Sequence, residues 1–394
     1  MFVKDMLKYI FFRGQKIIYR VICIFPIKRN RIVCMSHRGA SQYSDSPMYI
    51  TEYILKNYPG EFEIIWEVND LEKFSFLAEK GIKIIKFGSF MDYYYLNTAK
   101  VSITNSGFPS FMIKRKNQLR INTWHAGMSY KSGAVYGRKI STEATFFARR
   151  LKKYIKNQYN LMLSSCEVMS KERTEGAFQY KGEMLNCGLP RNDIMFQNNE
   201  SIIARIKEYY SIGYDKKILL VAPTWKQNND DRNIQIDYKE ICDLLEEKTK
   251  SKWVVLLRLH HLSVVNIEHI IREANGNVIN ATDYPNVQEL LFAADMLITD
   301  YSSVIWDFAL TGKPIVIFVP DNDEYKKVRG TFMPVKDWGL SYATNRAELL
   351  AVIKHSTIHE LENNSKQHIL KLHSYENGNA TETVVKRIVE FCKK

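Results

Sequence analysis

The chain has 394 residues, of which 45% are hydrophobic and 25% are charged. This balance is typical of a globular protein with a large core, and it excludes a disordered, collagen-like or disulfide-scaffold protein. Lysine and arginine number 56 against 43 acidic residues, so the net charge is +13 and we expect anionic partners such as phosphates, nucleotides, nucleic acids or membrane surfaces. The six cysteines are scattered without a C-x-x-C pair, which favours a reducing compartment.

Residues 1–30 are strongly basic and predict an amphipathic helix. On a helical wheel most apolar residues between Met6 and Ile22 gather on one side and the basic residues on the other, with Phe12 as the exception. This pattern is typical of a helix that lies in a membrane interface, and a helix packed on the domain is the alternative. The longest apolar run, residues 21–27, is far shorter than the roughly 20 residues that span a bilayer. Because no small-residue cleavage site follows it, we also expect no secretory signal.

Beyond residue 30, short apolar runs alternate with helical stretches, which favours parallel sheets covered on both faces. We expect an α/β fold of two doubly wound halves, residues 31–187 and residues 188–394, with ligands beyond the carboxyl ends of the strands. In the first half the predicted strands are residues 31–35, 62–66, 82–85, 101–104 and 119–123. In the second half they are residues 218–221, 253–257, 278–280, 296–299 and 315–319, and residues 345–391 are mostly helical.

A histidine follows the strand predicted at residues 119–123, in the sequence NTWHAG. Imidazole accepts a proton near neutral pH, so His125 is a candidate general base at the carboxyl end of a strand. For one isolated histidine, a hydrogen-bonded structural role is the alternative.

Strand ends in the second half carry groups suited to phosphates. Arg258 and His260 lie two residues apart, so in an extended chain they point to the same face and suit a pyrophosphate. Ser302 is a natural N-cap beside Ser303, where free backbone N–H groups and hydroxyls make an anion site. Residues 222–226 (APTWK) offer a hydroxyl and a cation at a third strand end. A solvated strand end and a plain helix cap are the alternatives for the first two.

Several common signatures are absent from the sequence: the phosphate loop, G-x-G-x-x-G after a strand, H-E-x-x-H and G-x-S-x-G. Their absence disfavours P-loop hydrolysis and standard dinucleotide chemistry. No Asp-x-Asp pair tied to a metal site follows a strand, and residues 321–323 (DND) are more simply a turn. These strand ends therefore offer no recognisable metal-binding pattern.

Taken in order, seven short segments resemble the CDP-glycerol glycerophosphotransferase family of teichoic acid and capsule biosynthesis. They are QYSDSP (42–47), TWH (123–125), GLPRND (188–193), APTW (222–225), LRLH (257–260), TDYSS (299–303) and RG (329–330). The resemblance implies two Rossmann-like domains of the GT-B type facing across a cleft, an N-terminal acceptor-binding domain and a C-terminal nucleotide-binding domain. It also implies transfer of glycerol phosphate from CDP-glycerol to an acceptor hydroxyl with release of CMP; relatives use CDP-ribitol. Because CMP leaves as a low-pKa phosphate that needs charge neutralisation more than protonation, we expect no obligatory metal and no other cofactor.

The implied acceptor is a saccharide or polymer linked to undecaprenyl diphosphate. The implied location is the cytoplasmic face of the bacterial cell membrane, with peripheral attachment to an anionic surface. We expect no nucleic-acid partner because no known binding motif interleaves aromatic residues with the positive charge. The sequence leaves open whether the protein forms a homo-oligomer.

The family's two essential histidines match His125 and His260, and His125 is the expected base. Residues expected to hold the donor's phosphates and nucleotide are Arg258, Ser302, Ser303, Thr224, Lys226 and Arg329. Those expected on the acceptor side are Gln42, Tyr43, Asp45 and Lys131.

The chain departs from the family after the histidine, where well-known members read Gly-Thr-Pro-Leu-Lys and this chain reads AGMSYK (126–131). This altered loop leaves the identity of donor and acceptor open. One alternative function is a GT-B glycosyltransferase that uses a nucleotide sugar in cell-surface polysaccharide synthesis. A basic module that only binds membranes or nucleic acids is a further alternative.

Overall fold

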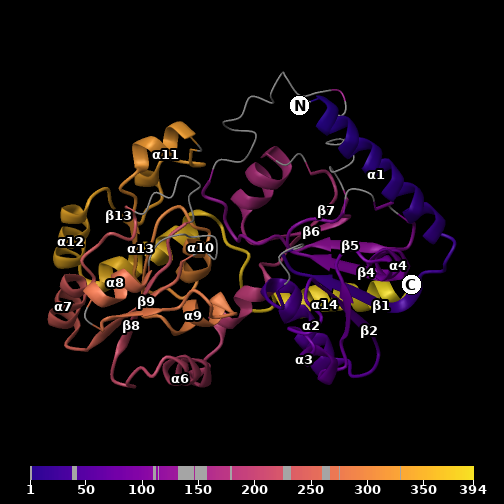
Figure 1. The fold of residues 1–394 in the computed structure, drawn as a ribbon. Helices are drawn as coiled ribbons and strands as arrows, with labels where there is room; N and C mark the ends of the chain where they lie inside the picture. Colours follow the sequence, from indigo (N-terminus) through magenta and orange to yellow (C-terminus); the bar gives the residue numbers. More distant parts are fainter. Residues whose placement is uncertain are drawn as a thin grey trace. The chain divides into compact units, whose positions relative to one another are not determined.

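The chain divides into two compact units in the computed structural model, each built around one sheet (Figure 1). Unit 1 comprises Met1–His125, Arg138–Asp193 and Tyr375–Lys394, and unit 2 comprises Ala126–Gly137 and Ile194–Ser374. The structure describes residues 2–37, 42–109, 112–113, 115–131, 146, 158–177, 180–224, 232–259, 267–274, 276–328 and 330–394.

The division into units differs from the predicted halves, which met at residues 187 and 188. Residues 188–193 and the last helix belong to unit 1, and the segment that follows His125 belongs to unit 2. The chain therefore passes between the units more than once. Sequence periodicity marks the elements but not the unit on which each one packs.

Unit 1 contains a sheet of parallel strands in the order β3-β2-β1-β4-β5-β6-β7. The strand order reverses between β1 and β4, and ligands of such sheets bind beyond the carboxyl ends of the strands at this switch point. The strands are β1 (Lys28–Met35), β2 (Glu63–Val68), β3 (Lys83–Lys86), β4 (Ala99–Thr104), β5 (Leu119–Asn122), β6 (Leu161–Ser164) and β7 (Glu183–Asn186).

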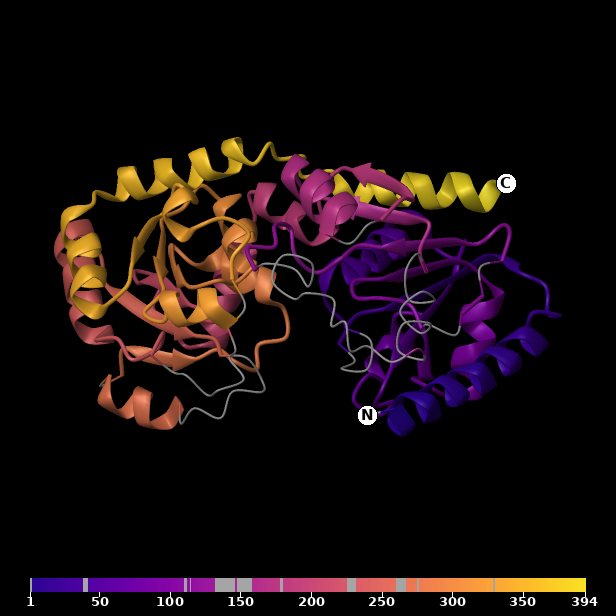
Figure 2. The same ribbon diagram turned by 90° about the horizontal axis from the view of Figure 1, so that it is seen from above.

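Helices cover both faces of the sheet in unit 1, as Figure 2 shows for α1 and α14. Strand β1 explains why, because its side chains alternate between two apolar clusters. Ile32 and Cys34 pack with α2 and α14, whereas Val33 and Met35 pack with α1 and α4. The helices are α1 (Phe2–Ile22), α2 (Asp45–Asn57), α3 (Phe76–Glu79), α4 (Phe90–Thr98) and α14 (Ala380–Lys393), with a π-helix at Met169–Ala177 and a 3₁₀ helix, η2, that begins at Pro190.

Unit 2 contains a second parallel sheet in the order β10-β9-β8-β11-β12-β13. Here the order reverses between β8 and β11. The strands are β8 (Lys217–Val221), β9 (Trp253–Leu257), β10 (Val278–Asn280), β11 (Met296–Thr299), β12 (Ile315–Phe318) and β13 (Ser341–Ala343). The helices are α6 (Glu200–Tyr209), α7 (Tyr238–Thr249), α8 (Ile267–Glu273), α9 (Val287–Ala293), α10 (Val304–Ala309), α11 (Asn322–Val328), α12 (Arg346–His355) and α13 (Ile358–Lys371), with a 3₁₀ turn at Val335–Asp337. The prediction of an α/β fold with parallel sheets is confirmed.

Helix α1 packs on unit 1 through a narrow stripe. Phe12, Tyr19 and Ile22 are buried, and Phe12 and Tyr19 belong to the apolar cluster that includes α4. Burial in this stripe explains why Phe12 was the exception on the helical wheel. Ile22, which the wheel placed on the membrane-facing apolar side, is also buried, so that prediction for Ile22 is wrong. A second apolar face of α1 is exposed: Val3, Leu7, Ile10, Phe11, Ile17, Ile18 and Val21.

Within the part of the chain that the structure describes, no helix combines the length and the apolar character that crossing a bilayer requires.

Candidate functional site

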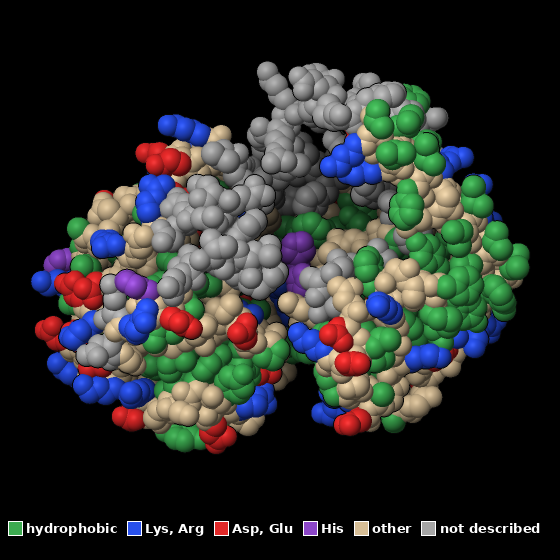
Figure 3. Space-filling view, viewed as in Figure 1, with side chains coloured by type: hydrophobic (Ala, Val, Ile, Leu, Met, Phe, Trp, Pro, Cys, Tyr) green, Lys and Arg blue, Asp and Glu red, His purple; other side chains and the backbone are tan. Residues whose placement is uncertain are grey.

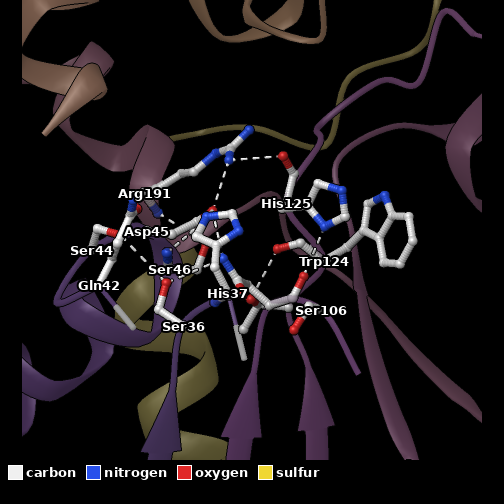
Figure 4. Close-up of polar contacts among 12 residues, drawn as sticks. Ser36, His37, Gln42, Ser44, Asp45, Ser46, Ser106, Trp124, His125 and Arg191 are labelled. Carbon is white, nitrogen blue, oxygen red and sulfur yellow. Dashed lines mark hydrogen bonds and ion pairs between the residues drawn. The ribbon is translucent and has the colours of Figure 1, made fainter. Parts of the chain in front are cut away.

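Three neighbouring strands of unit 1 end in polar residues at the switch point of the sheet. Ser36 and His37 follow β1, Asn105 and Ser106 follow β4, and His125 follows β5. Since the strands are parallel and adjacent, their carboxyl ends bring these side chains together although they are far apart in the sequence. Figure 4 shows the cluster above the strand ends.

The ring of His125 is held in a defined tautomer. Its Nδ1 lies 3.0 Å from the backbone carbonyl oxygen of Asn105. A carbonyl oxygen can only accept a hydrogen bond, so Nδ1 carries the hydrogen and, in the neutral ring, Nε2 carries the lone pair. The indole of Trp124 lies alongside, with ring centroids 4.4 Å apart. His125 is thus oriented as a proton acceptor through Nε2.

Asn105 links the ends of the three strands. Its side-chain carbonyl accepts a hydrogen bond from the backbone N–H of His37 at 2.7 Å. Its amide group donates to the Asp45 carboxylate at 2.9 Å and to the Ser36 hydroxyl at 3.3 Å. Together with the bond from His125 to its backbone, these contacts make Asn105 the centre of the cluster.

A buried ion pair, Asp45–Arg191, contacts both His37 and His125. Arg191 Nη1 is 3.1 Å from Asp45 Oδ2 and donates a second hydrogen bond, of 3.0 Å, to the carbonyl oxygen of His125. Burial is the largest influence on the Asp45 carboxyl and raises its pKa, but Arg191, His37 and hydrogen bonds from Ser46 and Asn105 together hold that pKa below its usual value. Asp45 is therefore charged near neutral pH.

The backbone of the cluster is strained. His37, Asp45 and Trp124 have φ angles of 45°, 61° and 57°, in the left-handed region that residues other than glycine rarely adopt. Such conformations cost of order 1–3 kcal/mol each and tend to occur at functional sites. His37 also lies near the other charged groups, with Nε2 3.6 Å from Asp45 Oδ2 and its ring centroid 6.1 Å from that of His125.

Sequence reasoning selected His125 and Asp45 in this cluster but missed His37, Asn105 and Arg191 as site residues. The available signal for His37 and Asn105 was their place directly after predicted strands. Arg191 belongs to the GLPRND segment, but its contacts with Asp45 and His125 depend on the tertiary fold and could not be read from the sequence.

The other residues expected on the acceptor side have different surroundings. The Tyr43 hydroxyl donates to Glu52 at 2.6 Å, and its ring packs on Trp66 in the core. Gln42 is exposed and accepts a hydrogen bond from Ser44. Lys131 belongs to unit 2, where its backbone pairs with Thr331. Asp45 is part of the histidine cluster, and Gln42 lies at its edge, because Ser44 Oγ is 3.4 Å from Ser36 Oγ.

The switch point of unit 2 is organised by a buried aspartate. Asp300 accepts hydrogen bonds from the backbone N–H groups of Thr224 and Tyr301 at 2.8 and 2.6 Å, and from the Asn233 amide at 2.9 Å. These bonds tie the end of β8 to the end of β11. The Thr224 hydroxyl is buried and has no hydrogen-bond partner among the described residues, so it is suited to contact a ligand.

Of the other residues predicted to contact phosphates in unit 2, the structure describes Arg258, Ser302 and Ser303. Helix α10 is capped by Ser303 rather than Ser302, and Ser302 Oγ accepts from the Val304 N–H at 3.5 Å. Arg258 is half-buried, and its Nη1 donates to the carbonyl oxygens of Ala281 and Tyr284 at 2.9 and 2.7 Å. That nitrogen therefore secures the chain after β10. The remaining predicted donor residues lie outside the described part of the chain: Lys226, His260 and Arg329.

The loop after His125 packs into unit 2. A Cβ on Gly127 would lie 2.0 Å from Trp306 Cδ1, so a larger residue does not fit there. Tyr130 is buried, and its hydroxyl lies 2.6 Å from Nε2 of His368, whose Nδ1 is 2.6 Å from the carbonyl oxygen of Trp338. Nδ1 is therefore the protonated nitrogen of a neutral His368, and Nε2 accepts from Tyr130. These contacts fix the segment that departs from the family's sequence.

His368 should make stability depend on pH. Burial lowers the pKa of His368 from 6.5 to about 4, a shift that the bond to Trp338 O opposes and Lys371 assists. Between these values the unfolded chain binds more protons than the folded one, so stability is full above pH 6.5 and falls as the pH drops toward 4. We expect wild-type protein to lose on the order of 2 kcal/mol more than a His368→Gln variant between about pH 7 and pH 5. Urea unfolding at both pH values measures this, and equal losses would contradict it.

Among the described residues, no group of three or more His, Cys, Asp and Glu side chains could hold a metal ion.

The fold and the site define an α/β protein in which two parallel sheets present polar residues at their switch points. A model of the CDP-Glycerol:Poly(glycerophosphate) glycerophosphotransferase family matches residues 17–390. The chain therefore belongs to this family.

Two curated relatives support this membership. A teichoic acid poly(glycerol phosphate) polymerase of Bacillus subtilis is 32% identical over 327 residues, which cover 81% of this chain and 43% of that protein. A protein of the same description from Bacillus spizizenii is 30% identical over 338 residues, which cover 84% of each. The chain thus spans less than half of the first relative and most of the second.

The fold is also that of a solved structure. A histidine-to-asparagine variant of the wall teichoic acid polymerase TagF, soaked with CDPG, superimposes with a TM-score of 0.79 at 24% sequence identity. The match covers 99% of this chain and 98% of that one. At this identity the likeness establishes the fold alone.

Proposed function

We propose that this protein transfers glycerol phosphate from CDP-glycerol to a hydroxyl group of a lipid-linked saccharide or polyol-phosphate polymer in teichoic acid synthesis, releasing CMP. The observation that carries the proposal is the oriented His125, with Nδ1 bound to Asn105 O and Nε2 as the proton acceptor, in a member of this family. The relatives described as poly(glycerol phosphate) polymerases support the choice of donor.

In the proposed reaction the acceptor oxygen attacks the phosphorus that bears glycerol. The new P–O bond forms as the bond to the CMP oxygen breaks, CMP leaves with the electron pair, and the hydroxyl proton passes to His125 Nε2. A positioned base of this kind contributes typically 10²–10⁴-fold in rate. His125 and the cluster of unit 1 therefore belong to the acceptor side in this account.

We assign the nucleotide and the diphosphate to unit 2. The Thr224 hydroxyl and the Ser302–Ser303 pair follow neighbouring strands there, and Asp300 fixes their backbone. His260, Lys226 and Arg329 would supply further contacts to the phosphates. Because CMP leaves as a stable phosphate anion, its departure needs charge neutralisation more than protonation, so we propose a reaction without an obligatory metal. The proposed arrangement is of the GT-B type.

The test is turnover with a panel of donors. Purified protein is incubated with a lipid-linked acceptor and, separately, CDP-glycerol, CDP-ribitol or UDP-sugars, with and without EDTA. The proposal expects acceptor-dependent CMP release from CDP-glycerol that EDTA does not abolish. If only CDP-ribitol is turned over, the proposed donor is wrong and the transferred group is ribitol phosphate. If only a UDP-sugar is turned over, the protein is a nucleotide-sugar glycosyltransferase and the proposal is wrong.

We also propose that α1 attaches the protein to an anionic membrane surface. Its exposed apolar face lies away from the Phe12–Tyr19 packing stripe, with Arg13 and Arg20 along one edge and Lys4 along the other. Figure 3 shows hydrophobic side chains gathered over this helix with lysine and arginine side chains nearby. A helix with an apolar face between basic residues lies in the headgroup region of a bilayer.

Point substitutions test this attachment better than truncation, because removing α1 would uncover the core beneath Phe12. We expect serine at Leu7, Phe11 and Ile18 to reduce sedimentation with phosphatidylglycerol vesicles at least tenfold without changing stability. Serine at Leu370, an exposed leucine of α13 in unit 2, is the matched control and should leave sedimentation unchanged. Unchanged sedimentation of the triple variant would refute the attachment.

A further inference from the structure

His125 is the last residue of unit 1 before the chain enters unit 2. The chain passes between the units at residues 125–126, 193–194 and 374–375 in its described parts, and a fourth passage, at residues 137–138, lies outside them. The candidate base therefore lies where the chain passes from unit 1 to unit 2. The His125 imidazole keeps one orientation only if the peptide at this position is itself held by hydrogen bonds.

One short segment of unit 1, residues 188–193, contacts the chain at the first and third described passages and ends at the second. Arg191 donates to the carbonyl oxygen of His125, at the first passage. Asp193 ends the segment at the second passage. Its carboxylate accepts hydrogen bonds from the backbone N–H groups of Ala380 and Thr381 at 3.0 and 2.7 Å, at the start of α14.

Glu376 completes the connection at the third passage. Its carboxylate accepts from the Leu189 N–H at 3.0 Å and from the Asn192 amide at 2.8 Å. Gly188 lets the chain approach it: its φ is 85°, and a Cβ there would lie 2.3 Å from a Glu376 oxygen. The segment that carries Arg191 is thus fixed by contacts that do not involve His125.

We propose that Arg191 is a positioning residue for His125. The imidazole is held from one side by the bond between Nδ1 and Asn105 O, and its peptide is held from the other side by Arg191 Nη1, which Asp45 orients. With both hydrogen bonds, the lone pair of Nε2 points in one direction. With only the bond between Nδ1 and Asn105 O, the peptide between residues 125 and 126 can rotate together with the loop of unit 2. Arg191 itself takes no part in bond making. The inference rests on the proposed role of His125 as the base.

The planar guanidinium explains the choice of side chain. A single nitrogen of Arg191, Nη1, reaches both Asp45 and His125, and the planar guanidinium fixes the directions of its N–H bonds. A lysine at this position would keep the positive charge, but its freely rotating ammonium group would not fix the direction of the hydrogen bonds. Small misplacements of a catalytic group cost up to about 10²-fold in rate.

The test compares Arg191→Gln, Arg191→Lys and Arg191→Ala with wild-type protein. We expect Arg191→Gln to lower kcat on the order of 10- to 100-fold per folded molecule, with the donor's KM changed less than about twofold. Arg191→Lys should recover only part of kcat, and millimolar guanidinium should partly restore Arg191→Ala. Arg31→Gln is the matched control, since Arg31 is also buried and paired with a carboxylate, Glu63, but lies in β1 away from its carboxyl end.

A second readout does not depend on activity. In protein with ¹⁵N-labelled histidine, assigned by comparison with His125→Asn, the wild-type ring should show the Nδ1–H tautomer and Arg191→Gln a mixture. If wild-type protein releases no CMP from CDP-glycerol, the proposed function fails while the tautomer shift still reports on positioning. If wild-type protein is active and Arg191→Gln keeps both its kcat and its tautomer, or if Arg31→Gln loses kcat equally, the positioning role is wrong.

Discussion

Replacing His125 with asparagine is expected to lower kcat by roughly 10²–10⁴-fold and to leave the donor's KM nearly unchanged. The asparagine amide can donate to the Asn105 carbonyl as Nδ1 does, so the local structure is kept. What it lacks is the basic lone pair of Nε2. The change therefore removes proton transfer and little else.

Steady-state kinetics of CMP release measures this effect, with His359→Asn as the control. His359 is an exposed histidine on α13 of unit 2 and should give wild-type kinetics. A His125→Asn variant with kcat within a factor of a few of wild type would show that another group takes the proton. An equal loss in both variants would point to an effect unrelated to the site.

Replacing Asp45 with asparagine is expected to destabilise unit 1 by about 3–5 kcal/mol. The substitution leaves the Arg191 guanidinium buried without its counter-charge. Asparagine tolerates a positive φ as aspartate does, so the φ of 61° at this position adds no new strain. The loss can therefore be attributed to the charge.

Urea unfolding of single and double variants separates the two contributions. A double variant, Asp45→Asn with Arg191→Met, removes both charges and should be more stable than Asp45→Asn alone, although a contact has been lost. If the double variant is the less stable one, or if Asp45→Asn costs under about 1 kcal/mol, the buried pair is not the main support of this cluster.

Local patterns in the sequence were sufficient to predict the layers of the fold. The apolar run at residues 31–35 predicted a buried strand, and the succession of strands and helices predicted a sheet covered on both faces; Ile32 and Val33 do face opposite helix layers. Three strands were missed: β6, β7 and β13. Strands just as short were predicted where an apolar run marked them, but β7 and β13 lie at the edges of their sheets and are only partly buried, so their sequences contain no such run.

The candidate site was predictable only one residue at a time. His125 could be found because a proton acceptor stands directly after a strand. Its partners could not, since the contact with Asn105 depends on β4 and β5 being neighbours, and the contact with Arg191 joins residues that are 66 positions apart. Similarly, Phe12 looked like a break in an amphipathic pattern because a wheel assumes one apolar face, whereas α1 has a packing stripe and an exposed face.

The most direct test of the account is the mass balance of one reaction mixture of wild-type protein, CDP-glycerol and a defined lipid-linked acceptor. Mass spectrometry of the acceptor and chromatography of the nucleotides give both products. We predict that each acceptor gains glycerol phosphate units in equal number to the CMP molecules formed, and that His125→Asn suppresses both products together. Formation of CDP with transfer of glycerol alone, or CMP formed without any gain in acceptor mass, would contradict it.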